Sequence, residues 1–189
     1  MATWRKVRPL RTLDFDCENR PLSYLGSDFT TPELTAVAYQ FVGEKGSDDV
    51  WVLGEDTLLS ILHGFREAWD RADIATGHNV RRHDLPLLNA MMLEAGLPPL
   101  HPKLVCDTWA DLKRRSPGFA SQATLAAILG VKAPKVGMST TDWREANRLT
   151  PEGIDKTRRR VVGDVKQHIA LRRELLKRDW LKPPTMWHP

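Results

Sequence analysis

Asp16 and Glu18 are the residues whose types and spacing most directly suggest chemistry in this chain. They end a strand-like run, and a strand alternates its side chains between two faces. Leu13, Phe15 and Cys17 therefore share one face as candidate core residues, while the two carboxylates lie side by side on the other. Two like charges about 4 Å apart repel by about 4 kcal/mol at an effective dielectric constant of about 20. A bound cation removes this repulsion, and ligands that are all oxygen favour Mg²⁺ or Mn²⁺.

A metal site is not the only interpretation of this pair, because acidic residues are common at strand ends and Asp-x-Glu often arises by chance. Asp14 lies on the same face as Asp16 and Glu18. It is a third candidate acid, but we expect it to lie further back on the strand and to pair with a surface Arg or Lys. Acids from other parts of the chain are needed to decide between these interpretations.

Asp84 is the first such acid. It follows Gly77-His78-Asn79, at the point where a short strand is expected to give way to a helix. An acid at this position can simply cap the helix or stabilise its positive N-terminal end. The same position also directs a carboxylate across the strand ends, where ligand sites in open α/β sheets gather.

Asp164 is the second such acid, and it lies inside the long C-terminal helix. The residues expected to face inward from this helix are Val161, Val165, Ile169, Arg172 and Leu176. Asp164 is one position from this stripe, so we expect it to border the core, where an acid requires a partner. Alternatively, it is a surface acid paired with Arg160 or Lys166 on a neighbouring turn.

Hydrophobic periodicity and turn residues predict the elements that must position these acids. Strands are expected at 11–16, 35–42, 50–53, 73–77 and 103–106. Helices are expected at about 57–71, 84–95, 121–129 and 150–178, with shorter ones beginning near 107 and 141, and a loop at 19–32. The first three strands form an antiparallel meander, and helices then alternate with strands. This order predicts an α/β fold with a mixed five-stranded sheet flanked by helices.

Length and composition predict one domain over residues 1–180 and a Pro-rich tail at 181–189, which either docks a partner or lies against the body. The formal net charge of +4 and the pI near 9.2 suggest an anionic partner. Basic residues cluster at 81–82, 113–115, 158–160 and 172–173, either as solvated faces or as the rim of a site. Two cysteines, no signal-peptide pattern and no apolar run of membrane-spanning length predict a soluble, cytoplasmic protein without a membrane partner.

The ordered set of acids resembles the DEDD family of 3′–5′ exonucleases, which have the RNase H-like fold and include the proofreading domains of DNA polymerases. Residues 13–18, Leu-Asp-Phe-Asp-Cys-Glu, resemble the first motif of the family. Residues 77–86 resemble the second motif and residues 163–165 the third, while 106–109 and 123–130 resemble the stretch between these two. The resemblance covers roughly residues 11 to 176. Each motif is weak alone, and the specificity comes from their order.

This resemblance implies a set of roles. Asp16, Glu18, Asp84 and Asp164 would hold two divalent ions, Mg²⁺ or Mn²⁺, about 4 Å apart and thereby form the catalytic site. One ion would activate a water that attacks the terminal phosphodiester, and the other would stabilise the leaving 3′ oxygen. His78 and Asn79 would contact the strand end. The implied substrate is a single-stranded or frayed DNA 3′ end, with RNA as an alternative, and proofreading during DNA replication would require a polymerase acting in trans.

The third motif departs from the family pattern. The family carries a Tyr four residues, or a His five residues, before the last Asp, and this chain has Arg160 and Arg159 in those positions. Neither can act as a base at neutral pH. Arg160 lies one helical turn before Asp164, so we expect it to project toward the site. His83, before the second-motif Asp, is expected to pack, and His168, one turn after Asp164, to be structural.

Three interpretations of this departure are open. Arg160 holds the scissile phosphate while the metal alone activates water; or a histidine from elsewhere, His83 or His78, supplies the base; or the site only binds nucleic acid. The leading hypothesis is a metal-dependent 3′–5′ exonuclease. The alternatives are a catalytically weak or inactive nucleic-acid-binding module on the same fold and a structure-selective endonuclease of the same superfamily.

Overall fold

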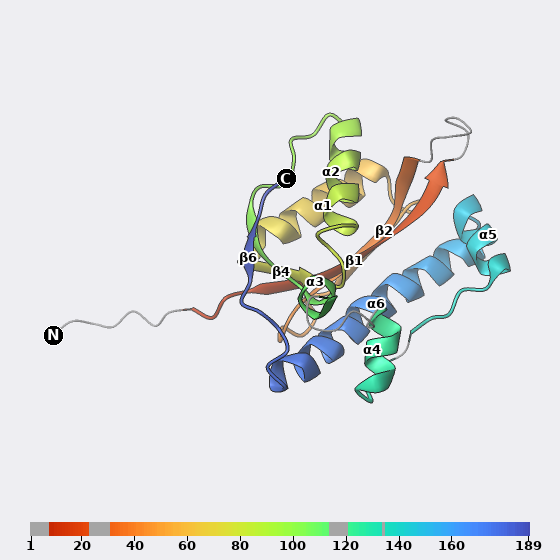
Figure 1. The fold of residues 1–189 in the computed structure, drawn as a ribbon. Coiled ribbons are helices and arrows are strands. Elements are labelled where there is room, and N and C mark those ends of the chain that lie inside the picture. The colour runs from red at the N-terminus through yellow and green to blue at the C-terminus, as the bar shows by residue number, and fades with distance from the viewer. Residues whose placement is uncertain (1–7, 23–30, 114–120, 134) are drawn as a thin grey trace.

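A mixed β-sheet forms the centre of the computed structural model, which describes residues 8–22, 31–113, 121–133 and 135–189 (Figure 1). Six strands pair within these described residues, in the spatial order β3-β2-β1-β4-β5-β6. The strands are β1 (Thr12–Leu22), β2 (Thr31–Phe41), β3 (Asp49–Val52), β4 (Ile74–Gly77), β5 (Lys103–Asp107) and β6 (Thr185–Trp187). β1 pairs antiparallel with β2 and parallel with β4, so it lies inside the sheet. The predicted α/β fold and meander are confirmed.

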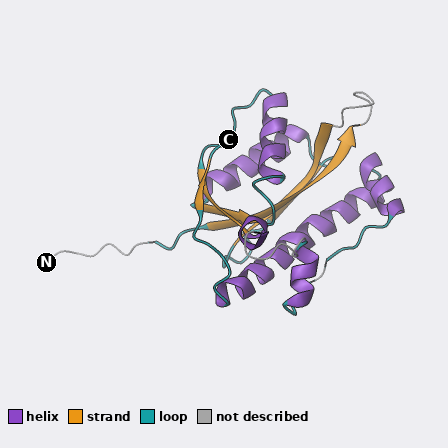
Figure 2. Ribbon diagram, in the orientation of Figure 1, coloured by secondary structure: helices purple, strands orange, loops and turns teal. Residues whose placement is uncertain are grey.

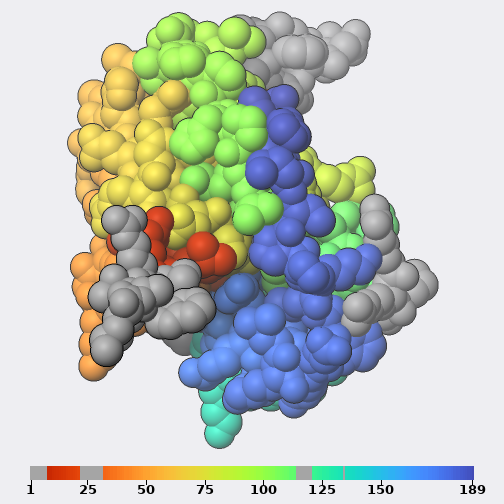
Figure 3. All heavy atoms as spheres, turned by 90° about the vertical axis from the view of Figure 1, so that its left-hand side faces the viewer, coloured from red at the N-terminus to blue at the C-terminus, as the bar shows by residue number. Residues whose placement is uncertain are grey.

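The sixth strand comes from the C-terminal segment, and the sequence analysis did not expect it. Residues 185–187 pair antiparallel with β5 and cover its outer edge, which would otherwise expose unpaired backbone groups. Trp187 is buried, and its ring meets that of Trp69 edge-on at a centroid distance of 5.7 Å. Figure 3 shows this segment, in dark blue, lying against the green part of the chain. The tail therefore lies against the body of the protein.

Helices cover both faces of the sheet (Figure 2). They are α1 (Leu58–Arg71), α2 (Asp84–Glu94), α3 (Thr108–Lys113), α4 (Gln122–Ile128), α5 (Thr140–Arg148) and α6 (Pro151–Lys177). α1 and α2 lie on one face, and α6, flanked by α4 and α5, lies on the other. Thr57, Ser121, Ser139 and Thr150 cap α1, α4, α5 and α6 by accepting backbone N–H bonds. None of the helices in the described ranges has the length and apolarity needed to cross a membrane.

β1 and β2 extend further than predicted, into the segment that was expected to be a loop. β1 continues to Leu22, and β2 begins at Thr31. The pairing of the two strands shifts register between Glu18 and Asn19. Arg20 lies opposite Glu33 in this ladder, and the two side chains form an ion pair. A cross-strand charge pair of this kind stabilises a polar strand whose composition otherwise suggests a loop.

The two faces of β1 differ as its alternation predicts. Phe15 is buried against Phe65 of α1, with ring centroids 5.1 Å apart, and Leu13 and Cys17 are buried on the same side. The opposite face carries Asp14, Asp16 and Glu18 and lies under α6. The acids of β1 are therefore directed toward the long helix rather than into the aromatic core.

The predicted inward stripe of α6 is right at its start and wrong at its end. Val161 and Val165 are buried, but Leu176 is half exposed, and Leu171 and Leu175 are buried in its place. The predicted stripe advances mostly in steps of four residues. An α-helix repeats every 3.6 residues, so such a stripe drifts around a helix of 27 residues.

Candidate metal centre

Three carboxylates meet between β1 and α6. One oxygen each from Asp16, Glu18 and Asp164 lies within 4.8 Å of the other two. Asp164 is 5% exposed and Glu18 is 9% exposed, while Asp16 is more accessible. The spacing read from the sequence places Asp16 and Glu18 on one face of β1, and the packing of α6 across that face brings Asp164 to them. The cluster is thus largely buried, and Asp16 is its most accessible member.

Asp84 approaches the same stretch of β1 from α2. It is the first residue of that helix and 2% exposed, and its Oδ1 accepts a hydrogen bond of 2.9 Å from the backbone N–H of Cys17. Cys17 lies between Asp16 and Glu18, so this bond fixes the start of α2 beside the pair. Asp84 is not within the 4.8 Å group of three, but it is among the charges that act most strongly on Asp16. The structure thus places all four predicted acids around one short stretch of β1.

The proximity of these acids raises the pKa of two of them. The pKa of Asp16 is well above its usual value, first because of burial and then because of the negative charges of Asp84, Glu18 and Asp164. The pKa of Glu18 is also raised, chiefly by burial, against an opposing effect of Arg160. Both carboxylates are therefore costly to ionise in the protein alone, and a bound cation would reverse that preference.

Arg160 enters the cluster, as its spacing from Asp164 predicts. Its Nε donates a 2.5 Å hydrogen bond to Glu18 Oε1, and its Nη2 lies 3.7 Å from Asp164 Oδ2. Two further contacts hold the guanidinium: Nη1 donates to the Val136 carbonyl at 3.2 Å, and the group lies 5.1 Å from the ring centroid of Trp143. A permanently charged side chain thus lies within the acidic cluster, one helical turn before Asp164.

Lys135 is a second cation at the site, and the sequence analysis did not single it out. Its Nζ lies 3.4 Å from Asp164 Oδ1. It belongs to the segment between α4 and α5, which has no motif and no periodicity from which its position could have been inferred. Contacts of Ala133, Lys135 and Val136 along α6, with Gln167, Asp164 and Arg160, bring it to the acids.

The donor set fits a hard divalent cation. All the candidate ligand atoms are carboxylate oxygens, which is the chemistry that Mg²⁺ and Mn²⁺ prefer. Asp164 Oδ1 is buried and accepts no hydrogen bond from the described residues, although Lys135 lies near it. A buried carboxylate oxygen without a donor retains coordination capacity. Asp16, Glu18 and Asp164 are therefore suited to hold a metal ion.

Asp14 does not pair with a surface Arg or Lys, so that prediction was wrong. It is fully buried, and both of its oxygens lie 2.8 Å from His168 Nδ1. His168 Nε2 lies 3.0 Å from Thr108 Oγ1, which in turn lies 3.0 Å from His78 Nδ1. Burial raises the pKa of Asp14, and the charge of His168 opposes that rise. A buried chain of polar groups thus runs from β1 through α6 to the end of β4.

His78 and Asn79 form the turn after β4. Burial, with the nearby His168 and Lys135, lowers the pKa of His78 to about 4, so its ring is neutral at physiological pH. His78 Nε2 is buried and forms no hydrogen bond with the described residues. Asn79 has a positive φ of 70°, which Asn tolerates better than most residues, and its backbone N–H donates to Asp107. Its Oδ1 is likewise buried and unbonded among the described residues.

His83 was expected to pack in the interior, and this prediction was wrong. Its side chain is 48% exposed, and Nδ1 lies 3.5 Å from Asp84 Oδ2. A hydrogen bond with Asp84 raises the pKa of His83. His83 therefore contacts one of the candidate ligands from the solvent side.

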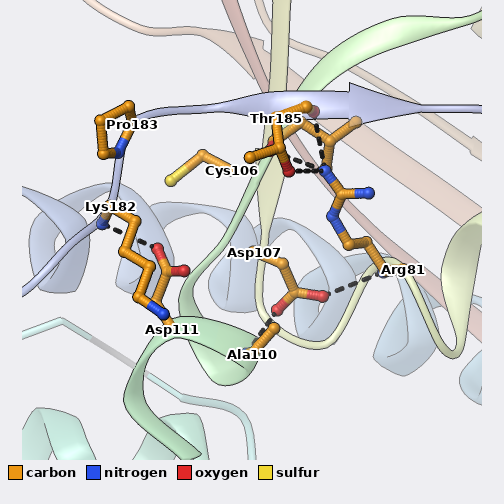
Figure 4. A pocket seen from close by; sticks show the side chains of 9 residues that line it. Arg81, Cys106, Asp107, Ala110, Asp111, Lys182, Pro183 and Thr185 are labelled. Carbon is orange, nitrogen blue, oxygen red and sulfur yellow. Dashed lines mark hydrogen bonds between the residues drawn. The ribbon is translucent and has the colours of Figure 1, made fainter. Parts of the chain in front are cut away.

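A separate cavity of about 230 Å³ lies between β5, α3 and the C-terminal segment (Figure 4). Arg81 borders it and donates to the carbonyls of Val105 and Thr185 at 3.0 and 2.8 Å, so it ties the tail to the sheet. None of the four acids is among the described residues that line this cavity. The basic cluster at 81–82 is thus partly structural rather than the rim of the acidic site.

Comparisons with known proteins support the fold. The chain superimposes on the family B DNA polymerase of the hyperthermophilic archaeon Pyrobaculum calidifontis with a TM-score of 0.69 and 20% sequence identity. The match covers 89% of this chain and 25% of the polymerase, so the chain corresponds to about a quarter of that protein. No protein-family model and no curated protein sequence matches the chain. The architecture is therefore that of a segment of a family B DNA polymerase.

Proposed function

We propose that this protein is a metal-dependent 3′–5′ exonuclease of the DEDD type, acting on single-stranded or frayed DNA ends. The observation that carries the proposal is the meeting of Asp16, Glu18 and Asp164 within 4.8 Å, with Asp84 fixed to the same stretch of β1. The likeness to part of a DNA polymerase supports DNA as the substrate. RNA is the alternative substrate for the same chemistry.

The four acids are proposed to hold two divalent ions, Mg²⁺ or Mn²⁺. When bound, such ions lower the pKa of a coordinated water and stabilise the charge that develops on the phosphate and the leaving oxygen. Asp16, on whose pKa the charges of the three other acids all act, would be the central ligand of this set. Asn79, whose Oδ1 is buried and forms no hydrogen bond with the described residues, is proposed to position the terminal nucleotide.

Arg160 and His78 are proposed to replace the missing Tyr or His of the third motif. Arg160 carries its charge into the acidic cluster, where it is suited to hold the scissile phosphate. His78 is neutral at physiological pH, and its Nε2, which has no hydrogen bond within the described ranges, is proposed to accept the proton of the attacking water. Asp14 pairs in parallel register with Thr76, and Asp16 and His78 each follow two residues later, so the turn that carries His78 begins beside this stretch of β1.

A second candidate function is a nucleic-acid-binding module without turnover. The contacts of Arg160 with Glu18 and of Lys135 with Asp164 favour it, because two side-chain cations already compensate part of the acidic charge. Binding without cleavage would be strongly salt-dependent.

A 5′-labelled single-stranded oligonucleotide, incubated with Mg²⁺ or Mn²⁺, separates these functions. The exonuclease proposal predicts stepwise shortening from the 3′ end, its loss in EDTA, and loss of at least about 100-fold in rate for Asp16→Asn and Asp164→Asn. Asp155→Asn is the matched control, since Asp155 is an exposed acid of the same helix that pairs only with Arg159 in the described contacts. Binding without shortening in either metal would favour the module, and products cut at internal positions would indicate an endonuclease.

A further inference from the structure

Arg160 is bound to an acid that the proposed function assigns to a metal ion. Glu18 is one of the three acids of the cluster, and its Oε1 accepts the 2.5 Å hydrogen bond of Arg160 Nε. The guanidinium also lies 3.7 Å from Asp164 Oδ2, so it spans two of the three candidate ligands. Its side chain is 18% exposed, which places the charge inside the cluster rather than at its rim.

Lys135 adds to this compensation from the other oxygen of Asp164, at 3.4 Å. If all four acids are ionised, the acids and the two cations together have a formal charge of minus two. One divalent ion balances that charge, whereas two ions would leave an excess of positive charge in a partly buried site. Such an excess is unfavourable until an anionic phosphate enters.

We propose that Arg160 is an exchangeable counter-ion that occupies one metal position until substrate binds. This inference rests on the proposed function. Without nucleic acid the site takes one divalent ion, held mainly by Asp16, which faces neither cation directly in the described contacts. When a phosphate arrives, the guanidinium transfers from Glu18 to the phosphate oxygens, and Glu18 becomes free to ligate a second ion. No bond of the substrate is broken in this exchange, and no proton moves.

The contacts of the guanidinium outside the cluster are consistent with such an exchange. The Val136 carbonyl and the ring of Trp143 also hold it, and neither belongs to the candidate ligands. Arg binds carboxylate and phosphate with the same planar fork of donors, so replacing Glu18 by a phosphate retains its hydrogen bonds. Lys135 keeps its charge near Asp164 throughout.

Mn²⁺ binding, measured by titration calorimetry and by the electron paramagnetic resonance signal of free Mn²⁺, tests the exchange without any turnover. We expect one ion per chain for wild type and two per chain for Arg160→Gln. The dissociation constant of the first ion should be at least about tenfold lower for Arg160→Gln than for wild type. Arg159→Gln is the matched control, because Arg159 is the neighbouring, 60% exposed residue that pairs with Asp155, and it should behave as wild type. Arg160→Lys keeps the charge and should also bind one ion.

A second readout is thermal unfolding. In EDTA, Arg160→Gln should unfold at a lower temperature than wild type, because Glu18 loses its cation, and saturating Mn²⁺ should raise its Tm more than that of wild type. Two ions bound by wild type, or unchanged stoichiometry and affinity in a folded Arg160→Gln, would overturn the exchange while leaving the proposed function intact. Absence of Mn²⁺ binding in every variant would overturn both.

Discussion

Asp14 and His168 form a buried pair in which both carboxylate oxygens lie 2.8 Å from His168 Nδ1. Asp14 precedes Asp16 by two residues on β1, and His168 follows Asp164 by about one turn on α6. The pair therefore joins the strand and the helix directly beside the acids that these elements carry. The geometry of the candidate metal centre depends on this internal contact as well as on its own ligands.

Replacing His168 by Ala should destabilise the protein by about 3–5 kcal/mol, because it leaves the fully buried Asp14 without its partner. Chemical denaturation in EDTA measures this loss. Lys166→Ala, at an exposed position of the same helix, should change stability by less than about 0.5 kcal/mol. A loss of similar size in both variants would show that the Asp14–His168 pair is not the cause.

Asp16→Asn should stabilise the metal-free protein at neutral pH. The pKa of Asp16 is raised in the folded state, so the folded protein holds a proton that the unfolded chain releases near pH 3.8. The cost of ionising Asp16 is absent below that pH, grows as the pH rises toward the folded pKa, and is then constant. Each unit by which the pKa is raised amounts to about 1.4 kcal/mol.

Urea denaturation in EDTA at pH 4 and pH 7.5 compares the two proteins. The Asp16→Asn variant should be more stable than wild type at pH 7.5, and the difference in unfolding free energy should be smaller at pH 4. Added Mg²⁺ should stabilise wild type and not the variant. Equal stability at both pH values would contradict the electrostatic account of Asp16.

His78 should make the folding stability depend on pH in the direction opposite to that of Asp16. Its pKa falls from 6.5 to about 4 on folding, so between these values the unfolded chain binds a proton that the folded protein does not. The contribution of His78 to stability is therefore full above pH 6.5 and is lost as the pH falls toward 4, by at most about 3 kcal/mol. The difference in unfolding free energy between wild type and His78→Asn, measured from pH 7.5 to pH 4, isolates this effect. A difference that does not change with pH would contradict it.

Trp187→Ala should lower stability by about 3 kcal/mol, since it removes a buried ring that meets Trp69 and leaves a cavity at the edge of the sheet. Met186→Ala is the control, because Met186 is the adjacent residue of β6 and is 51% exposed. Thermal unfolding of both variants checks this. If Trp187→Ala behaves like Met186→Ala, the tail adds little to the fold.

Much of the site could be predicted from local periodicity. Strand alternation places Asp16 and Glu18 together, and helix spacing directs Arg160 toward Asp164, as the structure shows. These predictions succeed because they depend on backbone geometry that repeats over a few residues. The start of α2 at Asp84 follows the same local rules.

The features that were missed depend on tertiary contacts. Lys135 reaches Asp164 from an irregular segment whose residues contact α6, and β6 pairs with the outer edge of β5. The burial of Asp14 opposite His168 also follows from the packing of two distant elements. No pattern within a short window specifies such contacts, so the sequence alone favoured a surface partner for Asp14 and left open whether the tail docks a partner or lies against the body.

Anomalous diffraction from a crystal soaked in Mn²⁺ shows whether Asp16, Glu18 and Asp164 bind a divalent ion. We expect a manganese peak at about 2.2 Å from a carboxylate oxygen of Asp16, with Glu18 or Asp164 as a further ligand. A well-ordered, Mn²⁺-saturated crystal with no peak among these acids would contradict the account.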